Sequence, residues 1–371
     1  MPSKNTNRIL PFNLSFVVTH QCNLNCIYCY ESQRDNQQAD PNFIKQTIAE
    51  YLNNETLVEV FIDFFGGEPW LKFELIKDVC EWTWNQSWKN KYHFHTSTNG
   101  TLVHGEIQEW LRSNKHRFSC GLSLDGTKDT HDKNRSNSFD KIDLNFFKEC
   151  WPTQPVKMTI SKYSINSIYN DISYIHSLGF KIAGTNFAEG IDWSDAKFSQ
   201  ILSNQLEKLL DFYANNPQYE VAPIINMPIE LCESSAKSPK WCGTGRYMAV
   251  YDLNQQKYPC QFFTPMTIPS EKFATLQNFD FEDDSNFEDK FCKNNCYFHA
   301  ICPNCYGANF LVNGRIDVRD KSMCNLIKIR AYYSAAMWAH KILNLSTNSD
   351  IEQTKIALKI RAIEKIKQLC E

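Results

Sequence analysis

The sequence predicts an α/β fold in which about six strand–helix units close into a partial barrel, followed by a cysteine-rich region and two terminal helices. Strand-like and helix-like segments alternate over roughly the first 215 residues, which is typical of a parallel sheet. Polar residues follow the strands at one end. From about residue 232 helical periodicity fades, and cysteines, prolines and glycines separate short segments. The last 45 or so residues return to helical spacing.

Taken in order, the segments have ordinary lengths. Strands are predicted at 13–18, 58–65, 93–97, 119–124, 157–161 and 181–186, and helices at 43–52, 73–84, 106–112, 168–178 and 195–213. A hairpin is predicted from 249–253 and 257–259, and terminal helices at 327–343 and 351–369. The expected domains are therefore a barrel over 12–215, a cysteine-rich domain over 216–326 and helices over 327–371.

Several polar or small residues stand at the C-terminal ends of the predicted strands. They are Cys22, Gly66, Ser97, Ser123 and Asn186. Barrels and open α/β sheets build their sites at this end, so these residues are expected to lie around one site.

Bulk composition excludes several classes of function. The chain has 371 residues, 42% hydrophobic and 22% charged, which is ample for a sizeable core. A net charge of −3 gives no electrostatic reason to expect nucleic-acid binding. The sequence has no run of 18 apolar residues and no N-terminal apolar segment. We therefore expect neither a membrane span nor a secretory signal, and predict a cytoplasmic protein.

The 15 cysteines are the unusual feature of the composition. An odd number cannot all form disulfides, and a chain of this length needs no disulfide staples. Cys80, Cys120 and Cys150 are interpreted as buried structural thiols. Of the others, three fall within eight residues near the start and five between Cys292 and Cys324. Clustered thiols in a reducing compartment usually bind metal.

The first cluster, Cys22, Cys26 and Cys29, has the spacing C-x3-C-x2-C. Three thiolates can hold three irons of a four-iron cubane and leave the fourth iron open, which suits a catalytic cluster. Zinc is the alternative, although a zinc site usually takes four ligands, commonly in C-x2-C pairs.

This spacing, with Tyr28 just before the last cysteine, resembles the signature of the radical S-adenosylmethionine (SAM) superfamily. The resemblance implies that Cys22, Cys26 and Cys29 hold a catalytic 4Fe–4S cluster whose open iron chelates SAM. It also implies reductive cleavage of SAM to a 5′-deoxyadenosyl radical, which takes a hydrogen atom from the substrate.

Further motifs resemble the SAM-binding elements of that superfamily. Gly66-Gly67-Glu68-Pro69 resembles its GGE motif, which implies binding of the SAM ammonium; alone, the glycines would indicate a tight turn. Polar strand-end residues resemble the ribose and adenosine contacts, and Arg135 resembles the arginine that pairs with the SAM carboxylate. The alternative for these polar strand-end residues is that they cap helices. The implied cofactor-binding set is Tyr28, Gly66, Gly67, Glu68, Ser97, Asn99, Ser123, Asp125, Arg135 and Ser161.

The later cysteines resemble the SPASM extension of radical SAM peptide and protein maturases. Cys242 and Cys260 bracket the predicted hairpin, with Gln255 where the pattern expects glycine, and the spacing after Cys292 departs by one residue at each end. The resemblance implies two auxiliary 4Fe–4S clusters, three clusters in all, with zinc as the alternative. The first would be held by Cys242, Cys260, Cys305 and, as candidate fourth ligand, Cys232; the second by Cys292, Cys296, Cys302 and Cys324. If Cys232 is a structural thiol, the first auxiliary cluster keeps an open iron.

SPASM proteins mostly act on peptides, which implies maturation of a ribosomally made peptide by cross-linking, epimerisation or backbone excision. Residues around Cys260 also resemble the anaerobic sulfatase maturases, which oxidise Cys or Ser to formylglycine. That branch carries a catalytic Asp directly after this cysteine, whereas Gln261 stands here, and an amide cannot serve as a general base. A non-enzymatic iron–sulfur redox or scaffold protein is a further alternative.

The resemblance also implies partners. They are a precursor peptide and a flavodoxin or ferredoxin as reductant. Because the first predicted strand begins near residue 13, no room remains before it for a leader-binding domain. We therefore expect either a separate leader-binding protein or direct binding of the substrate.

Overall fold

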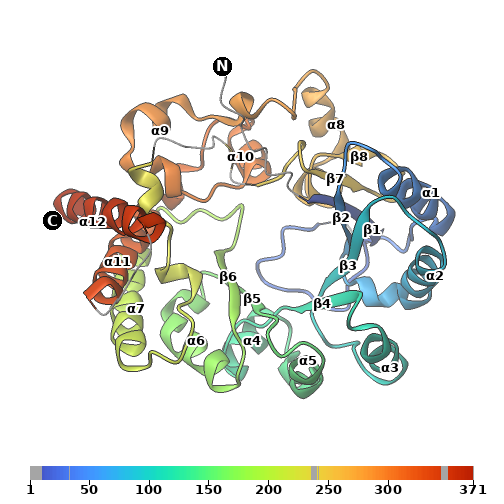
Figure 1. Ribbon diagram of the computed structural model, residues 1–371, viewed down its shortest axis with the longest axis horizontal. Coiled ribbons are helices and arrows are strands. Elements are labelled where there is room, and N and C mark those ends of the chain that lie inside the picture. The colour runs from blue at the N-terminus through green and yellow to red at the C-terminus, as the bar shows by residue number, and fades with distance from the viewer. Residues whose placement is uncertain (1–10, 33, 235–239, 241, 344–349, 371) are drawn as a thin grey trace.

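A computed structural model describes residues 11–32, 34–234, 240, 242–343 and 350–370, and its α/β architecture confirms the predicted fold class (Figure 1). One sheet has the strand order β4-β3-β2-β1-β7-β8, and a second pairs β5 with β6. The strands are β1 (Phe12–Thr19), β2 (Glu59–Gly66), β3 (Lys91–Thr98), β4 (Phe118–Leu122), β5 (Val156–Ile160), β6 (Ile182–Phe187), β7 (Met248–Tyr251) and β8 (Lys257–Tyr258).

The first six strands form the partial barrel. Neighbours from β1 to β4 pair in parallel, as do β5 and β6. A single parallel bridge between Ser123 and Lys157 joins β4 to β5. All six strands therefore point the same way, and their C-terminal ends meet at one rim of the barrel.

Helices cover the outer face of the strands (Figure 1). Along β2, Val60, Ile62 and Phe64 are fully buried, whereas the alternate residues are half-buried and face the barrel interior. The covering helices are α1 (Pro41–Leu52), α2 (Phe73–Trp84), α3 (Gly105–Asn114), α4 (Lys128–Asn134), α5 (Leu144–Cys150), α6 (Ile168–Ser177) and α7 (Ala196–Asn215). The sheet thus has an apolar outer face and a more polar inner face.

The cysteine-rich region consists of short helices and loops. It contains the predicted hairpin, in which Val250 on β7 lies opposite Tyr258 on β8. The sequence did not indicate that β7 would also pair in parallel with β1, where Leu14 lies opposite Ala249. The remaining α-helices of this region are α8 (Ser270–Phe273), α9 (Lys290–Asn295) and α10 (Tyr306–Asn313).

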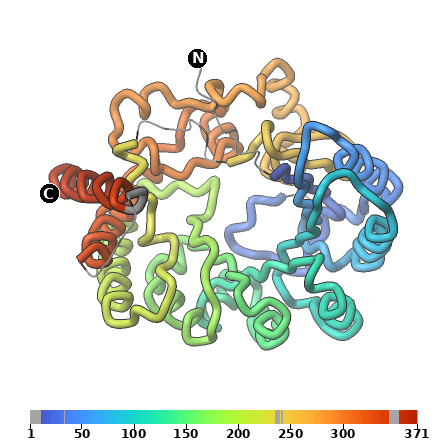
Figure 2. Tube along the Cα trace, in the orientation of Figure 1, coloured from blue at the N-terminus to red at the C-terminus, as the bar shows by residue number. Residues whose placement is uncertain are grey.

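Two long helices follow, α11 (Cys324–Leu343) and α12 (Asp350–Cys370), as predicted. They pack on each other, and α11 also packs on α7, so the end of the chain lies beside the barrel (Figures 1 and 2). Arg330 ties α11 to the segment after α7 by donating hydrogen bonds of 3.2 Å to the carbonyls of Ile224 and Pro223. Within the described residues, no helix combines the length and apolar character that crossing a membrane requires.

Candidate active site

The first cysteine loop lies at the C-terminal rim of the barrel, directly after β1. Cys22, Cys26 and Cys29 all line a cavity of about 280 Å³. The loop is tied to the end of α4, because the amide of Ile27 donates to the carbonyl of Asn134 at 3.0 Å. Burial raises the pKa of the Cys26 thiol to about 11, and it also raises the pKa values of the other two. Iron must therefore displace protons as it binds these thiols.

The backbone around the two glycines of the Gly-Gly-Glu motif leaves no room for a side chain. A Cβ on Gly66, which has a φ of +137°, or on Gly67 would lie 2.2 Å from a backbone carbonyl oxygen, of Thr19 and Gln21 respectively. The amide of Glu68 donates to the same Gln21 carbonyl at 2.8 Å. The structure shows that backbone at the end of β1 and the start of the cysteine loop occupies the space that a side chain at either position would need.

Glu68 is buried and lines the cavity. Its carboxylate accepts hydrogen bonds from the hydroxyl of Thr98 at 2.7 Å and the amide of Asn99 at 2.9 Å. Burial nevertheless raises its pKa to about 7. A cationic group in the cavity would favour the ionised form, so this carboxylate is placed to receive an ammonium.

Strand-end polar residues line the same cavity. The side chain of Asn99 donates to Asn23 at 2.9 Å, and the hydroxyl of Ser97 accepts from Lys157 at 2.9 Å. Ser123 also lines the cavity, and its amide donates to the carbonyl of Thr98 at 3.0 Å. The predicted strand-end residues Ser97, Asn99 and Ser123 are thus brought together with the cysteines.

Arg135 lines the cavity and is held from behind by Asp125. Its Nε and Nη2 atoms donate to the two carboxylate oxygens at 3.0 and 3.2 Å, and Tyr28 donates to the same carboxylate. The Arg135 guanidinium lowers the pKa of Asp125 although the carboxyl is fully buried. Asp125 does not line the cavity. Asp125 therefore positions the side chains of Arg135 and Tyr28 by accepting their hydrogen bonds.

Ser161 also stands outside the cavity lining. It is buried, its hydroxyl donates to Asn134 at 2.8 Å, and it accepts from the amide of Ser164 at 3.1 Å. The hydroxyl of Ser161 thus forms hydrogen bonds within the protein, and a contact between Ser161 and a cofactor stays a prediction.

The cavity includes residues that sequence reasoning missed. Glu31 and Arg34 follow the cysteine loop, and Thr159 and Glu189 come from β5 and the segment after β6. The Arg34 guanidinium donates to the Cys29 sulfur at 3.4 Å. Their proximity to the third cysteine could have indicated Glu31 and Arg34, whereas Glu189 required knowledge of the fold.

A second cavity, of about 420 Å³, gathers cysteines of the C-terminal region. Cys292, Cys296, Cys302 and Cys324 line it together with Cys305. The Asp289 carboxylate links two segments of the cavity lining. It accepts hydrogen bonds from the backbone amides of Cys292 at 2.9 Å and Arg319 at 3.0 Å. Five cysteines from three separate segments thus line one space.

The remaining cysteines are divided. Cys260 and Cys305 border one apolar cluster, and Cys242 lies close enough to influence both electrostatically. Cys232 instead ends the 3-10 helix η5 (Ile229–Cys232) and packs in a different cluster, with Cys296 and Cys302 at its edge. The structure therefore does not bring Cys232 together with Cys242, Cys260 and Cys305, as predicted for the first auxiliary cluster. The helix that carries Cys232, η5, packs instead against α12 and the 3-10 helix η9 (Tyr297–Ile301).

Among the described residues, no three His, Cys, Asp or Glu side chains converge as they would around a single metal ion. A cubane binds each thiolate through a different iron and therefore needs its thiolates further apart than one ion does.

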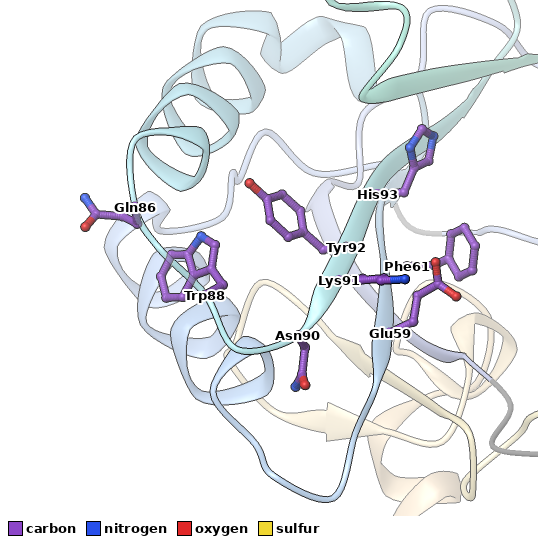
Figure 3. A pocket seen from close by; sticks show the side chains of 8 residues that line it. All are labelled: Glu59, Phe61, Gln86, Trp88, Asn90, Lys91, Tyr92 and His93. Carbon is purple, nitrogen blue, oxygen red and sulfur yellow. The ribbon is translucent and has the colours of Figure 1, made fainter.

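A shallow hollow of about 690 Å³ lies at the opposite end of β2 and β3 (Figure 3). Glu59, Lys91 and His93 line it from the strands, and Gln86 and Trp88 line it from the segment before β3. It is open to solvent and has no cysteine in its lining. It lies at the N-terminal rim, away from the end of the strands where such barrels place their chemistry.

Comparison with known proteins agrees with this geometry. Residues 16–145 match the model of the radical SAM superfamily. The chain therefore carries a radical SAM domain over these residues.

It is homologous to known maturases. It is 22% identical to a cysteine-type anaerobic sulfatase-maturating enzyme of Clostridium perfringens, over 84% of this chain and 90% of that protein. It is 23% identical to AlbA, the subtilosin biosynthesis protein of Bacillus subtilis, over 80% of this chain and 67% of that one. A shorter match, 35% identical, spans 31% of this chain and 38% of MJ0907 of Methanocaldococcus jannaschii.

Solved structures show the same fold. The sulfatase maturase anSMEcpe with bound AdoMet and Cp18Cys peptide superposes with a TM-score of 0.71 at 19% identity, covering 91% of this chain and 100% of that chain. SuiB of Streptococcus suis bound to its precursor peptide SuiA gives a TM-score of 0.57 at 17% identity, covering 85% and 76%.

Proposed function

We propose that this enzyme modifies a ribosomally made peptide by radical chemistry initiated at Cys22, Cys26 and Cys29. The observation that carries the proposal is the single cavity lined by these three thiols, Glu68 and Arg135. Relatives that act on or bind peptides, AlbA, SuiB and the sulfatase maturases, support the choice of substrate.

The residues present fit a 4Fe–4S cluster with bound SAM. Three thiols would hold three irons, and the bound pair would supply the 5′-deoxyadenosyl radical once an electron is delivered. Glu68 is placed to accept hydrogen bonds from an ammonium, and Arg135, held rigid by Asp125, to donate to a carboxylate. Tyr28 and the strand-end residues Ser97, Asn99 and Ser123 complete the wall.

The auxiliary clusters are part of the proposal. Cys292, Cys296, Cys302 and Cys324 share one cavity, which supports the second auxiliary cluster. Cys242, Cys260 and Cys305 would hold the first, and the separate packing of Cys232 favours a cluster with one position left for another ligand.

The test is anaerobic reconstitution with iron and sulfide, followed by dithionite and SAM. The wild-type enzyme should release 5′-deoxyadenosine, and Cys22→Ala, Cys26→Ala or Cys29→Ala should abolish it. Cys370→Ala, an exposed thiol outside these groups, is the matched control and should behave as wild type. Release of no 5′-deoxyadenosine, or purification with zinc alone, would overturn the proposal in favour of a structural or redox protein.

The substrate is identified by co-expression with small open reading frames encoded beside the gene, with mass spectrometry of each peptide. A cross-link shows as the loss of two hydrogens, and excision as a larger loss. Epimerisation leaves the mass unchanged and is detected by deuterium incorporation in heavy water.

Sulfatase maturation is the second candidate, supported by the 90% coverage of the Clostridium perfringens enzyme. Gln261 argues against it, since its side chain is an amide that donates to Ser15 at 3.1 Å. Formylglycine formation on a synthetic Cys-containing sulfatase peptide by the wild-type enzyme would establish this candidate instead.

A further inference from the structure

A layer of polar side chains lies inside the barrel below the first cavity. This lower polar layer consists of Ser15, Asp63, His95, Ser119, Lys157 and Gln261. Strand register places the first four side by side, with Ser15 opposite Asp63, Asp63 opposite His95, and His95 opposite Ser119. Phe65 and Ser97, two residues further along β2 and β3, line the cavity. Residues two apart share a face of a strand, so the layer begins about 7 Å below the cavity wall.

Asp63 is the distinctive member of this layer. Its Oδ2 atom accepts from the hydroxyl of Ser15 at 3.4 Å, and Ser15 accepts from the amide of Gln261 at 3.1 Å. Its Oδ1 atom is buried and has no hydrogen-bond partner among the residues that the structure describes. An unpaired buried acceptor costs free energy, so a hydrogen-bond donor on a bound substrate would relieve this cost.

The charged and titratable groups around Asp63 come from two other strands. Lys157 on β5 is the nearby cation, and its ammonium donates to Ser97 at 2.9 Å. His95 on β3 shares a hydrogen bond of 2.9 Å with Ser119, and burial lowers its pKa to about 4, so it is neutral. Burial raises the pKa of Asp63 to about 7, partly offset by Lys157. Asp63 can therefore take up or release a proton near neutral pH.

We propose that Asp63 is the proton acceptor for the peptide substrate, the role for which Gln261 lacks a basic group. This inference rests on the proposed function. A substrate side chain that passes Phe65 into the barrel would meet Oδ1 of Asp63. The proton of its S–H, O–H or N–H bond moves to Oδ1, and the electron pair of that bond stays on the substrate heteroatom. The carboxylate becomes a carboxylic acid, and the link through Ser15 to Gln261 holds its other oxygen in place.

The first test observes the carboxyl directly in the anaerobically reconstituted enzyme. Infrared difference spectra should show the C=O stretch of a protonated carboxylic acid that fades with a midpoint near pH 7. Asp63→Asn should remove this band, while Glu59→Gln, a carboxyl on the same strand at the solvent-exposed rim, should retain it. An Asp63 that stays protonated throughout pH 5–9 would overturn the proposal, because only the ionised carboxylate can accept a proton.

The second test separates this inference from the proposed function. With SAM and dithionite but no peptide, Asp63→Asn should release 5′-deoxyadenosine within twofold of wild type. If the variant loses this activity at unchanged iron content, Asp63 acts on SAM and the inference fails. If the wild type releases none, the proposed function fails while the infrared result still stands.

The third test uses the peptide that the wild-type enzyme modifies in the co-expression experiment. Asp63→Asn should reduce its modification at least tenfold, and Asp63→Glu should restore part of it with a shifted pH profile. Equal modification by wild type and Asp63→Asn would overturn the inference.

Discussion

The two groups of cysteines are held in different ways. The first loop rests on the rim of a parallel sheet and is fixed by backbone hydrogen bonds to the strand ends, such as that from Glu68 to Gln21 at 2.8 Å. The second group lies on short helices and loops, where side chains such as Asp289 provide the fixed points. The barrel can therefore shape its cysteine loop without metal, whereas the second group depends more on what its thiols bind.

Removal of iron should separate the two regions most strongly. After anaerobic chelation, limited proteolysis should cut residues 260–323 rapidly and leave the barrel as a resistant fragment. This part of the chain has little regular structure to replace the lost thiolate bonds. Mass spectrometry of the fragments locates the cuts. Equal resistance of both regions would show that the second group is as self-supporting as the first.

Breaking the buried pair behind the first cavity should have the next largest effect. Arg135→Met leaves the fully buried Asp125 carboxylate uncompensated and should lower the free energy of unfolding by about 3–5 kcal/mol. Urea unfolding measures the change. Lys128→Met, which removes an exposed ammonium paired with Asp132 and Asp140, is the control and should lower the free energy of unfolding much less.

This pair also gives a pH dependence of defined sign. The Arg135 guanidinium lowers the pKa of Asp125 in the folded protein. The contribution of this ion pair to the free energy of unfolding is therefore fully present above the unfolded pKa of about 4. It is lost as the pH falls through the lower folded value. The stability difference between wild type and Asp125→Asn should therefore shrink below pH 4, and a difference that grows in acid would contradict the assignment.

Gly67→Ala tests the close backbone contact of the first region. Its Cβ would lie 2.2 Å from the Gln21 carbonyl oxygen, and moving the loop should cost about 1–3 kcal/mol. Iron content per chain after reconstitution, together with urea unfolding, measures the effect. Gly184→Ala is the matched control, since its nearest neighbour would lie at 3.6 Å. If both variants bind iron equally well, the contact does not position the loop.

Asp289→Ala examines the side-chain anchoring of the second region. Loss of the hydrogen bonds to Cys292 and Arg319 should reduce stability by about 1–2 kcal/mol and loosen the second cavity. Hydrogen exchange of 290–324 reports the loosening. Asp283→Ala removes an exposed cap nearby and should leave exchange in this segment unchanged.

The smallest expected effect has the opposite sign. Gln255 adopts a φ of 63°, the left-handed conformation that favours glycine, at the position where the family pattern has glycine. Gln255→Gly should therefore stabilise the protein by about 1 kcal/mol in thermal unfolding. Gln256→Gly in the same turn gains no such relief and should be neutral or destabilising.

Sequence reasoning predicted well whatever depends on local pattern. The 3.6-residue spacing predicted α2 with its observed bounds, and strand-end residues such as Ser97 and Asn99 lie beside the cysteines as expected. The resemblance to the SPASM pattern grouped Cys292, Cys296, Cys302 and Cys324, and all four line one cavity, together with Cys305.

What it could not predict depends on contacts between distant segments. Asp125 carries the same strand-end signal as Ser123, yet its carboxyl turns away from the cavity to bind Arg135. Cys232 was placed by analogy, while its position follows from packing of η5 against α12. Asp63 drew no attention, because a single aspartate inside an apolar strand has no motif and becomes notable only when its neighbours are known.

The pairing of β7 with β1 has a consequence for how the chain is made. The first barrel strand emerges early from the ribosome, but the residues that complete its second edge, Met248–Tyr251, are synthesised much later. During that interval β1 offers unpaired amide and carbonyl groups to any other extended segment. A shortened chain that ends after α7 would carry this bare edge permanently and should be prone to self-association. The cysteine-rich region thus also covers, late in synthesis, an edge of the barrel strand that is made first.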